Sequence, residues 1–141
     1  MFYSQEVEDL RAFYFDVWRK LQAGEQLLPL EQQIANVLRD HPEFQSVLGT
    51  PDRSKSQQFY PELGQTNPFL HMGLHLAIRE QVSTDRPQGI LAIHQQLLQK
   101  YQDAHRVEHL MMEQLAEQLW LAQKNNLPPD EVNYLALLSD L

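Results

Sequence analysis

Apolar residues recur at intervals of three and four along most of the chain, the spacing that puts side chains on one face of an α-helix. The first such stripe begins after Ser4, a suitable N-cap, and ends at Gly24. A second, shorter helix opens at Pro29 and ends before Pro42. A further helical turn or two closes at Gly49.

The helix expected over residues 68–84 is apolar almost all the way round, as is typical of a helix in the middle of a bundle. Asn67 suits its N-cap, and Pro68 suits the first helical position, where a missing N–H costs nothing. The side chains that cover its two sides are Phe69, Leu70, Met72, Leu74, Leu76, Ala77, Ile78 and Val82.

Three more helices are expected after it. One stripe covers residues 90–101, Asp103 caps a long helix over residues 104–124, and a short helix follows over residues 130–139. No segment has the alternation of a strand. The pattern therefore predicts an all-α fold, a helical bundle of three to four long helices with short peripheral helices, in a single domain over residues 1–141.

Residues 50–66 interrupt this pattern. They contain Pro51, Pro61 and Gly64, with many polar residues and no sustained period, which predicts a long loop. Loops of this length are often functional, but an ordinary surface connection fits equally well.

Composition narrows the class of protein. The chain of 141 residues is 43% hydrophobic and has no cysteine, so disulfides, thiolate metal sites and cysteine nucleophiles are excluded. Its first residues lack the features of a secretion signal, and no apolar run approaches the roughly 20 residues of a membrane span. We expect a soluble cytoplasmic protein.

The net charge is −8, from 11 basic and 19 acidic residues, and the basic residues form no cluster. Nucleic-acid binding proteins usually carry a basic face, so no nucleic acid and no membrane is expected as a partner. A small-molecule ligand or a protein partner fits better. The oligomeric state stays open.

Histidines form two pairs at four-residue spacing. His71 and His75 lie one turn apart on the 68–84 helix, and His105 and His109 repeat that spacing on the 104–124 helix. Both pairs lie beside the apolar stripe of their helix. Six histidines placed at random would give roughly 0.25 such pairs, so two pairs favour a shared role.

Two carboxylates accompany the second pair. Glu108 falls in the middle of the apolar stripe, where an unpaired carboxylate is costly, and Glu113 lies at its margin. Each could be a metal ligand, an acceptor that fixes a histidine tautomer, or a base. Imidazoles and carboxylates without sulfur fit a divalent transition metal, zinc or iron first.

The sequence therefore predicts a metal site between the 68–84 and 104–124 helices. Its ligands would be His71, His75, His105, His109 and Glu113, with Glu108 as the catalytic base on a bound water. Of the other histidines, His94 is expected to pack in the core, and His41 to face solvent.

Known metal motifs match only in part. The run from His105 through Glu108 to His109 has the inverted zinc-peptidase pattern, but such peptidases are much larger. His109 and Glu113 are also ingredients of haemerythrin-like oxygen-binding bundles, in a different order. A mononuclear three-histidine site, as in small helical metal hydrolases, is equally compatible.

Two motifs carry a resemblance to a known family. These are Asn67-Pro-Phe-Leu-His71 with His75, and His105-x2-Glu108-His109-x-Met-Met-Glu113. Together they resemble a family of small bacterial proteins classified only as a domain of unknown function. The resemblance implies a bacterial origin and a helical fold, and it brings no established activity.

Two hypotheses follow. The first is a metal-binding helical bundle that acts as a metal-dependent hydrolase or as an oxygen or metal sensor. The second is a metal-free protein-interaction module whose acidic surface and aromatics, such as Phe2, Tyr3 and Tyr60, dock a partner. Whether the protein is an enzyme stays open.

Overall fold

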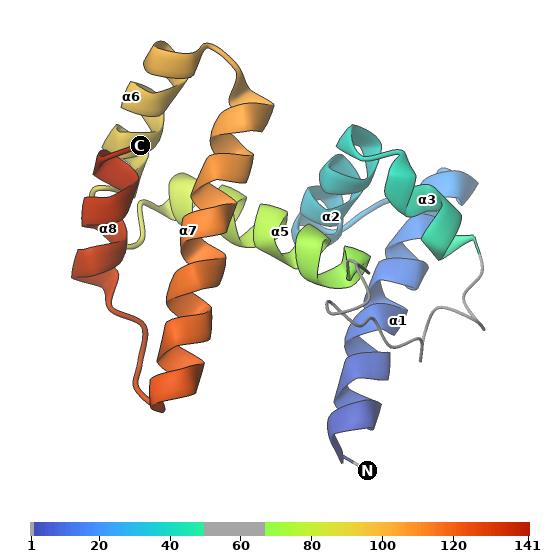
Figure 1. Cartoon of the computed structure of the whole chain (residues 1–141). Coiled ribbons are helices and arrows are strands. Elements are labelled where there is room, and N and C mark those ends of the chain that lie inside the picture. The colour runs from blue at the N-terminus through green and yellow to red at the C-terminus, as the bar shows by residue number, and fades with distance from the viewer. Residues whose placement is uncertain (1, 50–66) are drawn as a thin grey trace. The chain divides into compact units, whose positions relative to one another are not determined.

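The computed structural model describes the backbone of residues 2–49 and 67–141, with side chains from residue 11 onward (Figure 1). All regular structure in these ranges is helical, which confirms the predicted all-α class for this part of the chain. The helices are α1 (Phe2–Ala23), α2 (Pro29–Asp40), α3 (Glu43–Leu48), α5 (Pro68–Thr84), α6 (Ile90–Tyr101), α7 (Ala104–Asn125) and α8 (Glu131–Ser139). The predicted loop over residues 50–66 lies outside the described residues.

Contacts between these helices define two compact units, Met1–Met72 and Gly73–Leu141, and α5 runs from one into the other. The expected single domain, with one bundle of three to four long helices, stays a prediction.

Side chains cap the starts of three helices. Asn67, Asp103 and Asp130 each accept a hydrogen bond from the N–H three residues on, at 3.3, 3.1 and 3.0 Å. Such a bond satisfies one of the N–H groups that a helix start leaves without a partner. Gly24 ends α1 with a φ of 71°, a conformation that favours glycine. The first helix begins at Phe2, before the expected cap Ser4.

In the first unit, α2 and α3 pack against α1. One ion pair joins α1 to α2: Lys20 Nζ lies 2.8 Å from Glu31 Oε2. The other carboxylate oxygen, Oε1, accepts a hydrogen bond from the Leu28 N–H at 2.9 Å and so closes the first turn of α2. The buried apolar side chains of α1, α2 and α3 are Phe15, Val17, Ile34, Ala35, Val37, Leu38, Phe44 and Leu48.

Phe69 fixes the first turn of α5 to α1. Its buried ring lies 6.0 Å from the rings of Tyr14 and Phe15, and the Arg11 guanidinium lies 4.6 Å from its centroid. Aromatic and cation–π contacts of this kind favour one orientation of the ring. They set the rotation of α5 two residues before His71.

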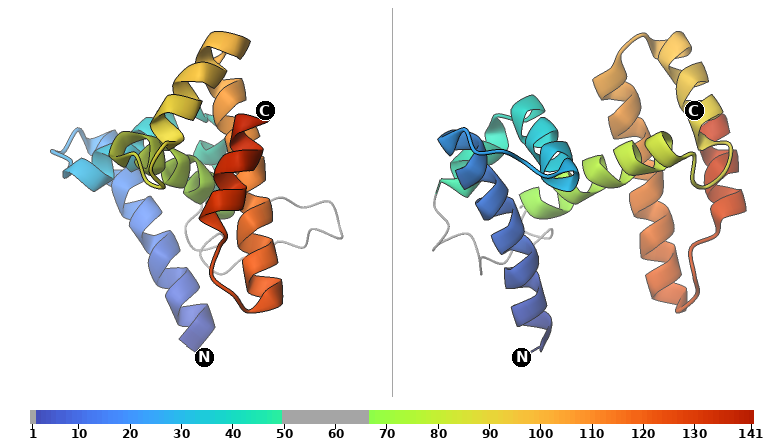
Figure 2. Two further views of the ribbon diagram at one scale, coloured as in Figure 1. Left: turned by 90° about the vertical axis from the view of Figure 1, so that its left-hand side faces the viewer. Right: turned by 180° about the vertical axis from the view of Figure 1, so that it is seen from behind.

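In the second unit, α6 and α8 run antiparallel to α7 and pack against it (Figure 1, Figure 2). Tyr134 on α8 donates a hydrogen bond to Gln81 Oε1 on α5 at 2.7 Å. The core residues of this unit are Ile78, Ile90, Leu97, Val107, Met111, Met112, Leu115, Tyr134 and Leu138.

Among the described residues, no helix combines the length and the apolar character needed to cross a membrane.

The ion pair of Glu31 predicts a pH dependence of stability. Hydrogen bonds from Lys20 and from the Leu28 N–H lower the pKa of Glu31 below its ordinary value. The stability that this carboxylate contributes is therefore present above the ordinary glutamate pKa of about 4.3, and it is lost as pH falls through the lower pKa of the folded state.

We expect Glu31→Gln to lower Tm at neutral pH and to approach the wild type in acid. Thermal melts followed by circular dichroism between neutral pH and pH 3 measure this. Glu25→Gln is the control, because it removes an exposed carboxylate that pairs with Arg19. A Tm difference that stays constant down to pH 3 would show that the charge is not responsible.

The packing of α8 in the second unit predicts how much its buried residues contribute to stability. Leu138 is fully buried, so Leu138→Ala should lower the free energy of unfolding by about 2–5 kcal/mol through lost contacts and a cavity. Val132→Ala, in the same helix at 81% exposure, should change it by less than about 0.5 kcal/mol. Urea denaturation measures both, and equal effects would contradict the packing described.

Candidate metal centre

Helix α5 carries two histidines, His71 and His75, one turn apart on the same side. The helix is continuous from residue 68 to residue 84, so its backbone holds the two rings in a fixed relation. His71 is half-buried and His75 is fully buried. Their environments supply the remaining groups of the candidate site.

His41 lies beside His71. It follows the last residue of α2, and its ring stacks on Phe44 at 5.1 Å and meets the edge of the His71 ring at 6.0 Å. Nδ1 lies 2.8 Å from the carbonyl oxygen of Val37, to which it donates as N–H. That bond selects the neutral tautomer whose lone pair is on Nε2, the arrangement of many metal-binding histidines.

The prediction that His41 faces solvent was wrong, because only 1% of this residue is exposed. Pro42 ends α2, and α3 begins at the next residue. The chain therefore turns back at once and places Phe44 over the imidazole.

His75 and His109 approach each other through their Nε2 atoms, which lie 3.2 Å apart. Two nitrogen ligands of one tetrahedral zinc ion are separated by about 3.3 Å, given Zn–N bonds of 2.0–2.1 Å. His75 Nδ1 donates to the carboxylate of Glu108, which leaves its Nε2 with the lone pair. The distance fits a hydrogen bond between the two rings, and it also fits two ligands that share one ion.

Glu108 is held on its other side by Arg79. The guanidinium Nε lies 3.1 and 3.2 Å from the two carboxylate oxygens, and a terminal nitrogen lies 3.1 Å from Oε1. Burial acts to raise the pKa of Glu108, but the hydrogen bond from His75 and the charge of Arg79 outweigh it, so the pKa is lowered. Glu108 is therefore an ionised acceptor that orients His75.

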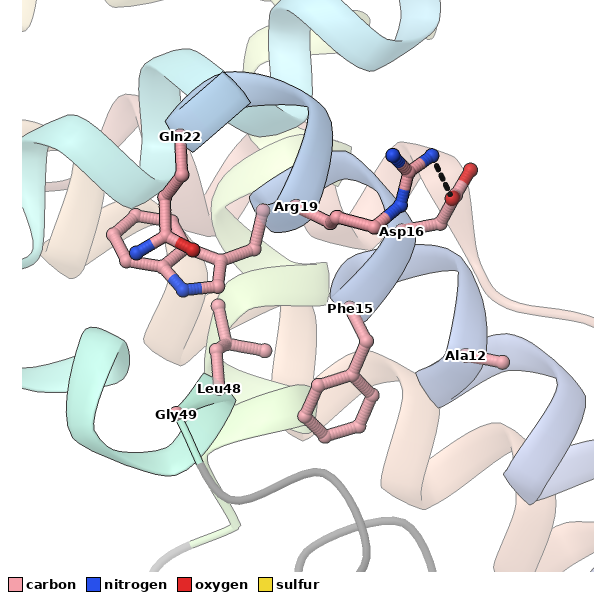
Figure 3. A pocket seen from close by; sticks show the side chains of 8 residues that line it. Ala12, Phe15, Asp16, Arg19, Gln22, Leu48 and Gly49 are labelled. Carbon is pink, nitrogen blue, oxygen red and sulfur yellow. Dashed lines mark hydrogen bonds and ion pairs between the residues drawn. The ribbon is translucent and has the colours of Figure 1, made fainter.

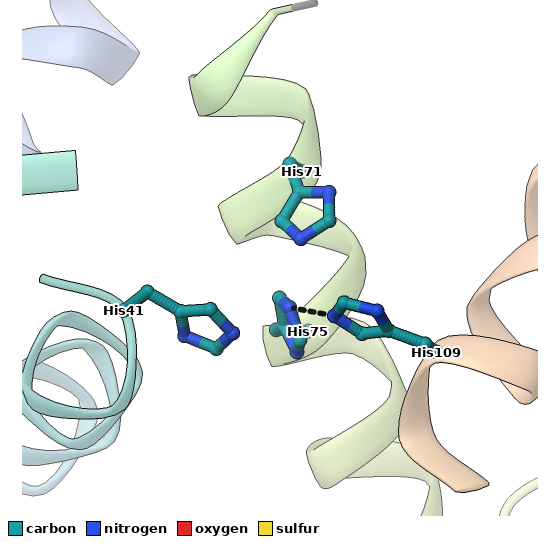
Figure 4. Close-up of side chains that lie close together, drawn as sticks. All are labelled: His41, His71, His75 and His109. Carbon is teal, nitrogen blue, oxygen red and sulfur yellow. Dashed lines mark hydrogen bonds between the residues drawn. The ribbon is translucent and has the colours of Figure 1, made fainter. Parts of the chain in front are cut away.

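One ring nitrogen from each of His41, His71, His75 and His109 lies within 4.8 Å of the other three (Figure 4). The four histidines lie close together in a way compatible with a metal site. Neutral imidazoles suit zinc, iron, copper and nickel, whereas magnesium and calcium prefer oxygen ligands, so the donor set fits a transition metal.

This group contains three of the predicted ligands, His71, His75 and His109, and it adds His41. His105 is exposed and is not part of it, although its ring lies 4.2 Å from that of His109 and 5.9 Å from that of His75.

The remaining candidates also lie outside the group. Glu113 is exposed. His94 is half-buried on α6. Burial lowers its pKa, and the negative charge of Glu108, which acts to raise the pKa, offsets this only in part. A catalytic role for Glu108 stays a prediction.

A local signal for His41 was present in the sequence. A histidine between the apolar stripe of α2 and a proline, with a phenylalanine three residues later, marks a tight helix end with apolar cover. Its approach to His71 had no such signal, because 30 residues separate the two in the sequence.

A surface hollow lies between α1 and the end of α3 (Figure 3). Its one carboxylate, Asp16, is paired with Arg19 at 3.0 Å, so the hollow offers no group of converging ligands. It is lined by Ala12, Phe15, Asp16, Trp18, Arg19, Gln22, Leu48 and Gly49.

Comparison with known proteins places the chain in a family. A family model for a domain of unknown function matches residues 6–140, nearly the whole chain. No curated protein and no solved structure matches it. The chain therefore belongs to the DUF1841 family, a domain of unknown function.

Proposed function

We propose that the protein is a metal-binding helical domain, in which His41, His71, His75 and His109 hold one divalent transition-metal ion. The observation that carries this proposal is the hydrogen bond from His75 Nδ1 to Glu108, beside a second imidazole nitrogen 3.2 Å from His75 Nε2. A histidine that donates one N–H to a carboxylate and turns its other nitrogen to a shared point is characteristic of metal sites.

Packing and hydrogen bonds alone are the other explanation of the histidine group. Buried polar groups need hydrogen-bond partners, and His41 and His75 each use Nδ1 for one. The Nε2 atoms of His75 and His109 lie within hydrogen-bond distance, so one ring can donate to the other. What favours a metal ion is that ring nitrogens of four histidines lie within 4.8 Å of one another.

The donor set supports zinc or iron as the ion, since it combines four neutral nitrogens with no sulfur. Glu108 acts in this proposal as the group that orients His75. His105 lies against the rings of two ligands, and Glu113 is not required. With such an ion, the protein could hydrolyse a substrate through a metal-bound water, or it could sense oxygen or the metal itself.

The alternative is a metal-free interaction module with an acidic surface. Three aromatic residues are expected to dock a partner. The structure does not describe the side chains of Phe2 and Tyr3, and Tyr60 lies outside the described residues. Support for this alternative therefore reduces to the net charge of −8. Under either reading we expect a small-molecule ligand or a protein partner, and neither nucleic acid nor membrane.

Metal content tests the proposal. Protein purified without a nickel column should contain about one zinc or iron ion per chain by elemental analysis, as one shared site requires. His41→Ala and His109→Ala should each lose most of the metal, because each removes a ligand. His105→Ala should keep it, because His105 is outside the group.

Circular dichroism of each variant serves as the folding control. Metal-free wild-type protein that neither takes up zinc or iron nor changes its Tm when these ions are added would contradict the site. Loss of metal in His105→Ala with retention in His41→Ala would instead favour the ligand set predicted from the sequence.

The Glu108 contact gives a second test. Glu108→Gln keeps an oxygen that accepts from His75 but removes the charge, and we expect zinc affinity to fall about 10- to 100-fold. Competition with a chromophoric chelator measures the affinity. Glu113→Gln on the same helix should leave it unchanged, and an equal loss in both variants would argue against a specific role for Glu108.

A further inference from the structure

The face of α7 that packs toward α8 carries a polar residue where the pattern calls for an apolar one. Met111 and Leu115 on this face belong to the core of the second unit, and Gln118 follows them at helical spacing. Only 4% of Gln118 is exposed, yet its side-chain amide makes no hydrogen bond to any other residue in the described part of the chain. Buried amides normally have a partner, so one from outside the chain is expected.

A second surface hollow, of about 230 Å³, lies beside Gln118, where the chain turns back from α7 into α8 (Figure 1). The amide atoms of Gln118 are not sealed from solvent, so the small exposed part of this side chain faces the hollow. The Leu127 N–H donates to the Ala122 carbonyl at 2.9 Å and closes the end of α7. Pro128 has no N–H and cannot extend this bonding. The turn thus leaves space for a ligand atom next to the amide.

The walls of this hollow combine apolar surface with one negative charge. Leu121, Leu127 and Pro128 supply apolar surface, and Asp130 is the one ionised residue of the lining. Asp130 Oδ1 accepts from the Asn133 N–H as the cap of α8, and no cation among the described residues pairs with this carboxylate. The end of α7 and the start of α8 contribute opposite partial charges, so the sign of the charge in the hollow follows from Asp130.

We propose that this hollow binds a primary ammonium group on a short alkyl chain, offered by a free amine or by a lysine side chain. An ammonium group has three N–H donors and no acceptor. It would donate to the side-chain oxygen of Gln118 and to the carboxylate of Asp130, while the alkyl chain packs on Leu127 and Pro128. The site is separate from the histidine group and does not rest on the proposed metal ion.

Other ligands use fewer features of the hollow. A carboxylate would meet the like charge of Asp130, and a water molecule would satisfy Gln118 without covering the apolar wall. Pockets for drug-sized molecules measure roughly 300–1,000 Å³, so a volume of about 230 Å³ suits a ligand of few atoms. A short alkylammonium combines this size with both kinds of contact.

The ammonium ion of n-butylamine is the probe, and nuclear magnetic resonance of ¹⁵N-labelled protein measures its binding at constant pH and ionic strength. We expect saturable shifts in the amide signals of residues 118–133, with a Kd on the order of 1 mM, as a ligand of so few atoms allows. The alcohol 1-butanol has a similar size and no charge. It should bind about fivefold more weakly, which is the contribution of one exposed ion pair.

The source of the group is tested with a lysine capped at both backbone ends. Binding of this compound more tightly than n-butylammonium would support a lysine side chain of a protein as the ligand. Weaker binding would support a free amine.

Two variants test the two polar groups. Gln118→Leu removes the amide at similar size, and Asp130→Asn removes the charge but keeps an oxygen that can cap α8. Each should lower the affinity for n-butylammonium about fivefold or more, whereas Asp130→Asn should leave 1-butanol unaffected. Glu131→Gln is the matched control and should leave both affinities unchanged, because Glu131 is an exposed carboxylate next to Asp130 that does not line the hollow.

Three outcomes would overturn this inference. A titration without saturable shifts in residues 118–133 would leave water as the partner of Gln118. Equal affinities for n-butylammonium and 1-butanol would exclude recognition of the charge. Equal losses in Asp130→Asn and Glu131→Gln would indicate attraction to the acidic surface in general. Circular dichroism checks the fold of each variant, and Asp130→Asn keeps the test decisive should Gln118→Leu fail to fold.

Discussion

The hydrogen bond between His75 and Glu108 is the contact on which the candidate site depends. It joins α5 to α7 in the middle of an apolar interface, where the neighbouring core includes Ile78 and Met111. A carboxylate at such a position is tolerated only with full hydrogen bonding and an opposite charge. Arg79 supplies that charge, one turn after His75 on the same helix.

This contact also helps to set the rotation of α7. Glu108 and the next residue, His109, both reach the ring of His75 from α7. The Nε2 atom of His109 lies 3.2 Å from His75 Nε2. The buried polar contact and the apolar packing of Val107 and Met111 together set the rotation of α7.

Local features of the fold could be predicted from the sequence, because they depend on neighbouring residues. The caps at Asn67 and Asp103 and the end of α1 at Gly24 lie where the pattern places them. His71 and His75 lie close together in the histidine group for the same reason, since i and i+4 positions share a face.

The choice among histidines depends on contacts between distant segments, which periodicity does not contain. His105 and His109 share a face, yet they lie about 6 Å apart along the axis of α7. Two helices that cross are in close contact over only a short stretch, so the two histidines need not reach the same point. His41 follows the end of a different helix, α2, and has no histidine at four-residue spacing. Its position follows from the turn at Pro42 and the stacking on Phe44.

Arg79 links the stability of the second unit to the chemistry of the site. Without a nearby cation, the ionised carboxylate of Glu108 would be costly to bury. Glu108 would otherwise take up a proton, and it would then no longer accept the hydrogen bond from His75 as a carboxylate. With Arg79 present, the carboxylate stays ionised and keeps its hydrogen bond with His75. The residue that makes the buried acid tolerable therefore also preserves the orientation of His75.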